Sequence, residues 1–152
     1  MGKDDIPPCL IYIDNEGRWY HQGAEMIRRD FIRIFYKNME LDFEGRYLIN
    51  WAKKPCYVEV EDTAFVVTRV TYEEGNGAGK GRFFLTLSDE TREVLMPDTL
   101  YTGEDNVLYC KVKDGTFPAR FVRAAYYQLA EHVEEEDGVY FISLNGRRYN
   151  IT

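Results

Sequence analysis

Arginine side chains gather in two stretches of the sequence, where they could bind an anion. The first stretch holds Arg28 and Arg33, and the second holds Arg120 and Arg123. A guanidinium group presents a planar fork of donors that suits a phosphate or a carboxylate. In a chain with a net charge of −7, this concentration of positive charge predicts an anion site. A solvated basic face, or internal ion pairs, would give the same pattern.

Aromatic and acidic residues near the arginines could complete such a site. Trp19 and Tyr126 could stack on a ring of the ligand, while Glu61 and Asp62 could orient the guanidinium groups. The same two carboxylates would allow general acid–base chemistry. However, no Gly-x-Ser-x-Gly, His-Glu-x-x-His or Cys–His signature accompanies them. We therefore expect binding rather than catalysis, and we assign no catalytic residue.

Cysteine and histidine spacing indicates no metal centre. The cysteines, Cys9, Cys56 and Cys110, are far apart, and no Cys-x-x-Cys occurs. Each lies among apolar residues, which favours a structural role as a small buried hydrophobe. His21 and His132 share no ligand spacing with each other or with the cysteines. We expect no metal, and the pattern names no cofactor.

The glycine-rich stretch 75–81 resembles a phosphate-binding loop but fails in detail. Position 74 is Glu and position 81 is Gly, where a P-loop needs Gly and then Ser or Thr. No predicted helix follows the stretch. It is therefore interpreted as a hairpin connector.

Composition excludes several classes of protein. The 152 residues are 45% apolar and 30% charged, which is typical of a globular chain. An acidic chain is a poor binder of duplex nucleic acid, because that affinity depends on neutralising phosphates. No run of 18 apolar residues predicts a membrane span, and residues 1–10 lack the apolar core of a secretory signal. The expected location is the cytoplasm.

Two helices and a series of strands are expected to position these residues. Residues 24–38 carry an apolar stripe at helical spacing, formed by Ile27, Phe31, Ile34 and Phe35. A second helix is predicted after Thr116 as N-cap, with Pro118 in its first turn and with Arg120 and Arg123 on it. Strands are predicted at 10–13, 18–20, 47–49, 58–60, 65–72, 83–87, 108–112 and 139–142.

The two ends of the chain follow a similar order of elements, which suggests an internal duplication. Residues 10–49 match residues 108–142 as strand, glycine turn, helix, acidic-glycine turn and aromatic strand. The sequence thus predicts an α+β fold of two related strand–helix–strand halves around an antiparallel meander. We expect an N-terminal arm at 1–9, an N-terminal half at 10–60 and a C-terminal half at 61–152.

Three blocks resemble a bacterial family, domain-of-unknown-function family 1285. They read Gly17-x-Trp19-Tyr20-x-x-Gly23-x-x-Met26-x-Arg28-x-x-Phe31-Ile32-Arg33-Ile34-Phe35, then Val58-Glu59-Val60-Glu61-Asp62-x-x-Phe65-Val66, and finally Tyr109-x-x-Val112-Lys113-x-Gly115 with Ala119-Arg120, Arg123-Ala124 and Tyr126-Tyr127-x-Leu129. The chain departs from the family where Ala24-Glu25 replaces Ser-Pro, where Asn50-Trp51-Ala52-Lys53 replaces Thr-Pro-x-Glu, and where Ala64 replaces a proline.

The resemblance implies a duplicated α+β fold whose C-terminal half is similar to pleckstrin-homology-like domains. It also implies a ligand site between the halves and a role in signal transduction. We therefore expect a ligand-binding or regulatory module for a small anionic or nucleotide-like ligand at the junction of the halves. The alternatives are a protein-interaction module without a small-molecule ligand, or a hydrolase that uses Glu61 and Asp62. The predicted ligand-binding residues are Trp19, Arg28, Arg33, Glu61, Asp62, Arg120, Arg123 and Tyr126.

Overall fold

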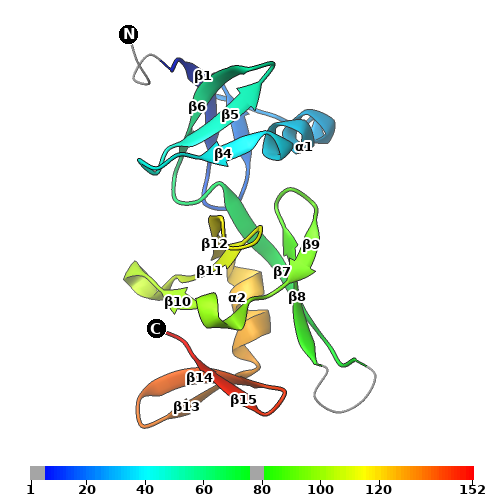
Figure 1. The fold of residues 1–152 in the computed structure, drawn as a ribbon, viewed down its shortest axis with the longest axis vertical. Helices are drawn as coiled ribbons and strands as arrows, with labels where there is room; N and C mark the ends of the chain where they lie inside the picture. The colour runs from blue at the N-terminus through cyan, green and yellow to red at the C-terminus, as the bar shows by residue number, and fades with distance from the viewer. Residues whose placement is uncertain (1–5, 76–80) are drawn as a thin grey trace. The chain divides into compact units, whose positions relative to one another are not determined.

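The computed structural model describes residues 6–75 and 81–152. The chain divides into two compact units, Met1–Ala64 and Phe65–Thr152, and each is described by itself (Figure 1). The predicted division falls at residues 60 and 61. Within the predicted arm at 1–9, residues 1–5 lie outside the described part, while Pro8 and Cys9 belong to a strand. In the predicted glycine connector, residues 76–80 also lie outside it.

The N-terminal unit is a six-stranded sheet with one helix. Its sheet order is β3-β2-β1-β6-β5-β4, and only the central strands β1 and β6 run parallel. Its elements are β1 (Pro8–Ile13), β2 (Trp19–His21), β3 (Ala24–Glu25), α1 (Arg29–Lys37), β4 (Met39–Leu41), β5 (Tyr47–Trp51) and β6 (Lys54–Val60). Alternation along β1 buries Ile11 and Ile13 and leaves Tyr12 on the other face.

Two hairpins of this sheet are closed by the same five-residue motif, Asp-x-Glu-Gly-Arg, at 14–18 and 42–46. Asp14 Oδ1 accepts the backbone N–H of Arg18 at 2.9 Å, and Arg18 Nε donates to Asp14 Oδ2 at 2.8 Å. Asp42 and Arg46 repeat both bonds, at 2.8 and 2.9 Å. The glycine of each motif has a left-handed φ, 83° and 84°, which favours glycine. A local side-chain cap therefore fixes β1–β2 and β4–β5.

Helix α1 differs from its prediction in length and in orientation. Residues 24 and 25 do not begin it, because they pair with β2 as strand β3. The helix buries Ile32 and Tyr36, while Phe31 and Ile34 of the predicted stripe are exposed. Ile27, which precedes the helix, is 82% exposed. Most of the predicted stripe is therefore exposed, and only Phe35, which stacks on Trp19, is half-buried.

A buried hydrogen-bond chain explains which face of α1 lies inside. The indole Nε1 of Trp19 donates to the Tyr36 hydroxyl at 3.0 Å, and that hydroxyl donates to the carbonyl of Ala64 at 2.8 Å. All three residues are buried. A buried indole and phenol each need a polar partner, so this pair orients the helix more strongly than its apolar stripe does.

In its described residues, the C-terminal unit holds a second six-stranded sheet, one α-helix, two short 3₁₀ helices labelled η2 and η3, and a small three-stranded sheet (Figure 1). The large sheet has the order β10-β11-β12-β7-β8-β9, with β7 and β12 parallel, and the small sheet has the order β13-β14-β15. The elements are β7 (Phe65–Glu73), β8 (Arg82–Leu87), β9 (Arg92–Val94), η2 (Pro97–Thr99), β10 (Tyr101–Thr102), η3 (Glu104–Asn106), β11 (Leu108–Val112), β12 (Phe117–Phe121), α2 (Arg123–Ala130), β13 (Val133–Glu136), β14 (Val139–Leu144) and β15 (Arg147–Asn150).

The predicted start of the second helix is wrong. Pro118 and Arg120 lie on strand β12, and α2 begins only at Arg123. Phe117, Ala119 and Phe121 are buried in alternation, as a strand between two partners requires. Pairing with β11 on one side and β7 on the other therefore outweighs the local helix-start signals.

The two six-stranded sheets follow the same path, which is consistent with an internal duplication. In each sheet, the first three strands follow one another from the centre to one edge. The next three follow one another from the opposite edge back to the centre, where the sixth strand lies beside the first and parallel to it. The matching elements are therefore β1–β6 and β7–β12, not the predicted strand–helix–strand units. The helices are not equivalent, because α1 lies between β3 and β4 while α2 follows β12. The pleckstrin-homology-like character of the C-terminal half stays a prediction.

The three cysteines are structural, but not in the same way. Cys9 and Cys56 form a disulfide between β1 and β6, so the expectation of buried hydrophobes is wrong for this pair. Cys110 is a free and fully buried thiol. Burial, with a contribution from Glu93, raises the pKa of Cys110 to about 12. Cys110 is therefore an unreactive core residue.

Candidate functional site

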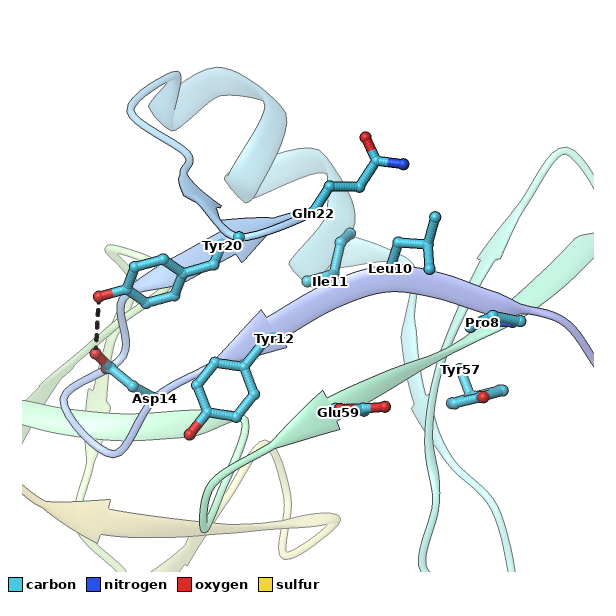
Figure 2. A pocket seen from close by; sticks show the side chains of 10 residues that line it. Pro8, Leu10, Ile11, Tyr12, Asp14, Tyr20, Gln22, Tyr57 and Glu59 are labelled. Atoms are coloured by element: carbon cyan, nitrogen blue, oxygen red, sulfur yellow. Dashed lines mark hydrogen bonds between the residues drawn. The ribbon is translucent and has the colours of Figure 1, made fainter.

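A row of three side chains crosses the face of the N-terminal sheet opposite α1. The strand register places Tyr12 beside Tyr20 of β2 on one side and beside Glu59 of β6 on the other. Directly paired residues of neighbouring strands share a face, so the two rings and the carboxylate lie together. Figure 2 shows both rings beside one another, and their centroids are 6.2 Å apart.

This row forms part of a pocket of about 500 Å³. Its lining is aromatic, apolar and acidic, and consists of Pro8, Leu10, Ile11, Tyr12, Asp14, Tyr20, Gln22, Gly23, Tyr57 and Glu59 (Figure 2). None of these residues is Lys or Arg. The pocket therefore offers ring faces, hydroxyls and carboxylates, and no cationic side chain, to a ligand.

The backbone of β1 is irregular where it lines this pocket. Leu10 has a φ of 65°, a left-handed conformation that costs a non-glycine residue roughly 1–2 kcal/mol. The register between β1 and β6 shifts between Pro8 and Tyr12, and the Gln22 N–H donates to the Leu10 carbonyl at 3.0 Å. Bulges and strained residues cluster next to functional sites. This irregularity is a second feature, besides the lining, that marks the pocket.

Asp14 is the buried acid of the pocket and is fully engaged. Its carboxylate accepts from Arg18 Nε at 2.8 Å and from the Tyr20 hydroxyl at 3.3 Å. Burial acts to raise the pKa of Asp14, but hydrogen bonds from Arg18 and from the turn outweigh it and hold the pKa below its usual range. Asp14 is therefore ionised at neutral pH, and it orients Tyr20 rather than offering a free charge.

Glu59 is the free acid of the pocket. It is exposed, and in the described part of the chain it takes part in no hydrogen bond or ion pair. Glu61, two residues further on, accepts the Asn15 backbone N–H at 3.0 Å and so holds the β1–β2 turn. Desolvation and the neighbouring Glu61 carboxylate raise the pKa of Tyr12. At neutral pH Tyr12 thus keeps its proton.

The predicted site residues of the N-terminal unit do not line this pocket. Trp19 is 1% exposed and stacks on Phe35, so it has no free face for a ligand, and the predicted stacking role does not fit its burial. Arg28 precedes α1 and pairs with Asp30 at 2.8 Å in the solvent. Arg33 is exposed on α1, and Asp62 is half-buried after β6.

The other predicted residues lie in the C-terminal unit. Arg120 is half-buried on β12, and Arg123 is exposed at the first position of α2, with its guanidinium 5.8 Å from the Tyr127 ring centroid. Tyr126 lines a second pocket of about 500 Å³, together with Glu134, Glu135 and Tyr140 among others. No arginine lines that pocket, so neither pocket has the positive charge that the sequence predicts.

Within residues 6–75 and 81–152, no group of three or more His, Cys, Asp or Glu side chains is placed to hold a metal ion. Neither α1 nor α2, the α-helices of this described part, has the length and apolar character that a membrane span needs.

Comparison with known proteins identifies the fold. No family model matches the sequence, and no curated protein matches it. Two solved crystal structures are similar. A DUF1285 family protein from Silicibacter pomeroyi DSS-3 gives a TM-score of 0.77 at 21% identity, covering 96% of this chain and 80% of that one. A DUF1285 family protein from Shewanella baltica OS155 gives a TM-score of 0.64 at 17% identity, covering 80% of this chain and 91% of that one. At these identities the likeness concerns the fold.

Proposed function

We propose that the chain, which shares the fold of solved DUF1285 family proteins, is a ligand-binding module whose N-terminal sheet binds an organic ammonium group. One observation carries the proposal. Tyr20, Tyr12 and Glu59 form a row of two ring faces and one unpaired carboxylate, in a pocket without Lys or Arg. Aromatic faces beside a carboxylate attract a cation, whereas an anion would be repelled by Glu59.

The interactions available set the expected affinity. A cation over a tyrosine ring gains about 0.5–1 kcal/mol at an exposed site and about 2 when desolvated. An exposed ion pair adds at most about 1 kcal/mol. Because a Kd of 1 mM corresponds to about 4 kcal/mol, we expect a small ammonium compound to bind in the millimolar range. Contacts with Pro8 and Leu10 would then add affinity for the rest of a natural ligand.

The experiment compares choline with its uncharged isostere 3,3-dimethylbutan-1-ol. Both are titrated into the ¹⁵N-labelled full chain at constant ionic strength, and amide shifts are followed by NMR. Choline should shift amides of β1, β2 and β6 in a saturable way, and the isostere should bind at least several-fold more weakly. Equal binding of the two compounds would contradict the proposal.

Two variants locate the effect. Glu59→Gln removes the free charge of the pocket, and Tyr12→Ala removes the central ring, so each should weaken choline binding by up to about fivefold. Glu104→Gln is the charge-matched control, because Glu104 is exposed on η3 in the other unit. Choline binding that is unchanged by Glu59→Gln would refute the assignment of this pocket.

The anionic or nucleotide-like ligand predicted from the arginines is a second proposal, with one observation in its favour. The first turn of α2 has no side-chain cap, and exposed Arg123 lies at its first position. Helix N-termini and guanidinium groups both favour anions. A thermal-shift panel of phosphate, nucleotides and inositol phosphates tests it. A selective stabilisation that Arg123→Gln abolishes would support this second ligand, and a flat panel would refute it.

A further inference from the structure

We propose that a groove beside α1, on the opposite face of the N-terminal sheet, binds a long-chain alkyl carboxylate. The groove has a volume of about 520 Å³, and its lining has one residue, Ile11, in common with that of the ammonium pocket. Along β6, Lys54 and Cys56 line the groove, whereas Tyr57 and Glu59 line the pocket, as alternation along a strand requires. The two sites therefore share a sheet but no face of β6.

The walls of the groove are apolar and come from the helix and from the sheet. Phe31 and Phe35 of α1 form one wall, and Trp51 of β5 forms the other, with the Trp51 and Phe35 rings edge-to-face at 6.4 Å. Buried Ile11 and Ile49 lie in its lining. Such an apolar concavity has the size and the lining of a small-molecule site.

Two large apolar side chains, Phe31 and Trp51, remain exposed at this groove. Phe31 is 46% exposed and Trp51 is 52% exposed, although both are large apolar residues in direct reach of the groove. A contiguous exposed apolar patch on a folded unit often marks an interaction site or a ligand-binding groove. An apolar ligand in the groove would cover Phe31 and Phe35, two of the four residues of the predicted stripe.

Charge decides which apolar ligand fits. The lining contains no Asp or Glu, in a chain whose net charge is −7. It contains one lysine, Lys54, and in the described part of the chain Lys54 takes part in no ion pair. An alkyl chain would lie against Phe31, Phe35 and Trp51, and its terminal carboxylate would accept hydrogen bonds from the Lys54 ammonium. A neutral or cationic amphiphile would leave Lys54 unmatched.

Intrinsic fluorescence can follow this binding without a label. The chain has two tryptophans, and Trp51 lines the groove while Trp19 is buried in the core. Sodium decanoate, kept below its micellar concentration, should change the emission of the full chain in a saturable way. The change should vanish in Trp51→Phe, which keeps Trp19. Lengthening the chain to dodecanoate should tighten binding by up to about fourfold for each methylene that is buried.

Variants separate the apolar contact from the charged one. Lys54→Met should weaken decanoate by up to about fivefold and leave 1-decanol unchanged, while Lys111→Met on β11 serves as the control. Phe31→Asp, at an exposed position, should abolish binding of both compounds with the far-UV circular dichroism unchanged. Decanoate affinity unaffected by Lys54→Met, or a signal that persists in Trp51→Phe, would overturn the proposal. Binding to anionic vesicles but not to free decanoate would also overturn it, in favour of a membrane surface.

Discussion

Replacing Tyr36 by phenylalanine tests the buried network that orients α1. The hydroxyl accepts from Trp19 Nε1 at 3.0 Å and donates to the Ala64 carbonyl at 2.8 Å. Tyr36 is 4% exposed and both partners are less exposed still, so water cannot replace the lost hydroxyl. Each buried group left without a partner costs about 1–3 kcal/mol. Tyr36→Phe should therefore lower the free energy of unfolding by about 2–5 kcal/mol.

Urea unfolding followed by tryptophan fluorescence is the assay, because Trp19 and Trp51 both lie in the N-terminal unit. The midpoint should fall while the m-value stays constant. Tyr20→Phe is the control. It also removes a hydroxyl, but Tyr20 is half-buried and Asp14 keeps its bond to Arg18, so the loss should stay below about 1 kcal/mol. A loss for Tyr36→Phe as small as that of the control would refute the reasoning.

Three further predictions concern the stability of the N-terminal unit. Reducing the Cys9–Cys56 disulfide, or replacing both cysteines by serine, should destabilise the unit by about 2–4 kcal/mol, because the bond closes a loop of 47 residues. Urea unfolding with and without reductant measures this loss, and equal unfolding midpoints would contradict the prediction. Asp42→Asn should destabilise the chain at pH 7 and progressively less below about pH 4. Desolvation acts to raise the pKa of Asp42, but hydrogen bonds from Arg46 and within the turn outweigh it and hold the pKa below its usual range. The contribution of Asp42 is therefore present above the unfolded pKa and is lost as the pH falls through the folded one; a pH series of thermal melts checks this, and a pH-independent difference would contradict it. Gly45→Val should lower the free energy of unfolding by roughly 1–2 kcal/mol, because Gly45 has a left-handed φ of 84°. A variant that melts at the same temperature as the wild-type chain would contradict this.

Most strands could be predicted from the sequence because their signal is local. Alternation along 10–13 and 108–112 reports directly which side of each strand is apolar. The segment Phe117–Phe121 was predicted as the start of a helix, because Thr116 as N-cap with Pro118 in the first turn is a helix-start signal. Its pairing with β7, some 50 residues earlier in the chain, decides the matter, and no local pattern encodes that partner.

The orientation of α1 shows a second limit. Helical spacing identifies Phe31, Ile34 and Phe35 as one stripe, but it does not say what covers that stripe. The structure turns Tyr36 inward instead, because its hydroxyl meets Trp19 Nε1 and the Ala64 carbonyl. Only the positions of these distant partners reveal which face of the helix is buried.

The candidate pocket depends on a long-range pairing that the sequence pattern does not contain. Tyr12 and Glu59 become neighbours only because β1 and β6 run parallel at the centre of the sheet. One usable signal was present. The Asp-x-Glu-Gly-Arg motif occurs at 14–18 and at 42–46, and it indicates two hairpin turns of the same construction. It would have placed Asp14 in the first of these turns.

The ratio of choline affinity to 3,3-dimethylbutan-1-ol affinity, measured by NMR on the wild-type chain and on Glu59→Gln, tests the proposed function most directly. The two ligands differ in charge and hardly in shape, so the ratio isolates recognition of the cation. We predict a ratio of at least several-fold for the wild-type chain, reduced by up to about fivefold in Glu59→Gln because both rings remain, with the shifts centred on Tyr12 and Tyr20. A ratio of one in the wild-type chain would contradict the account.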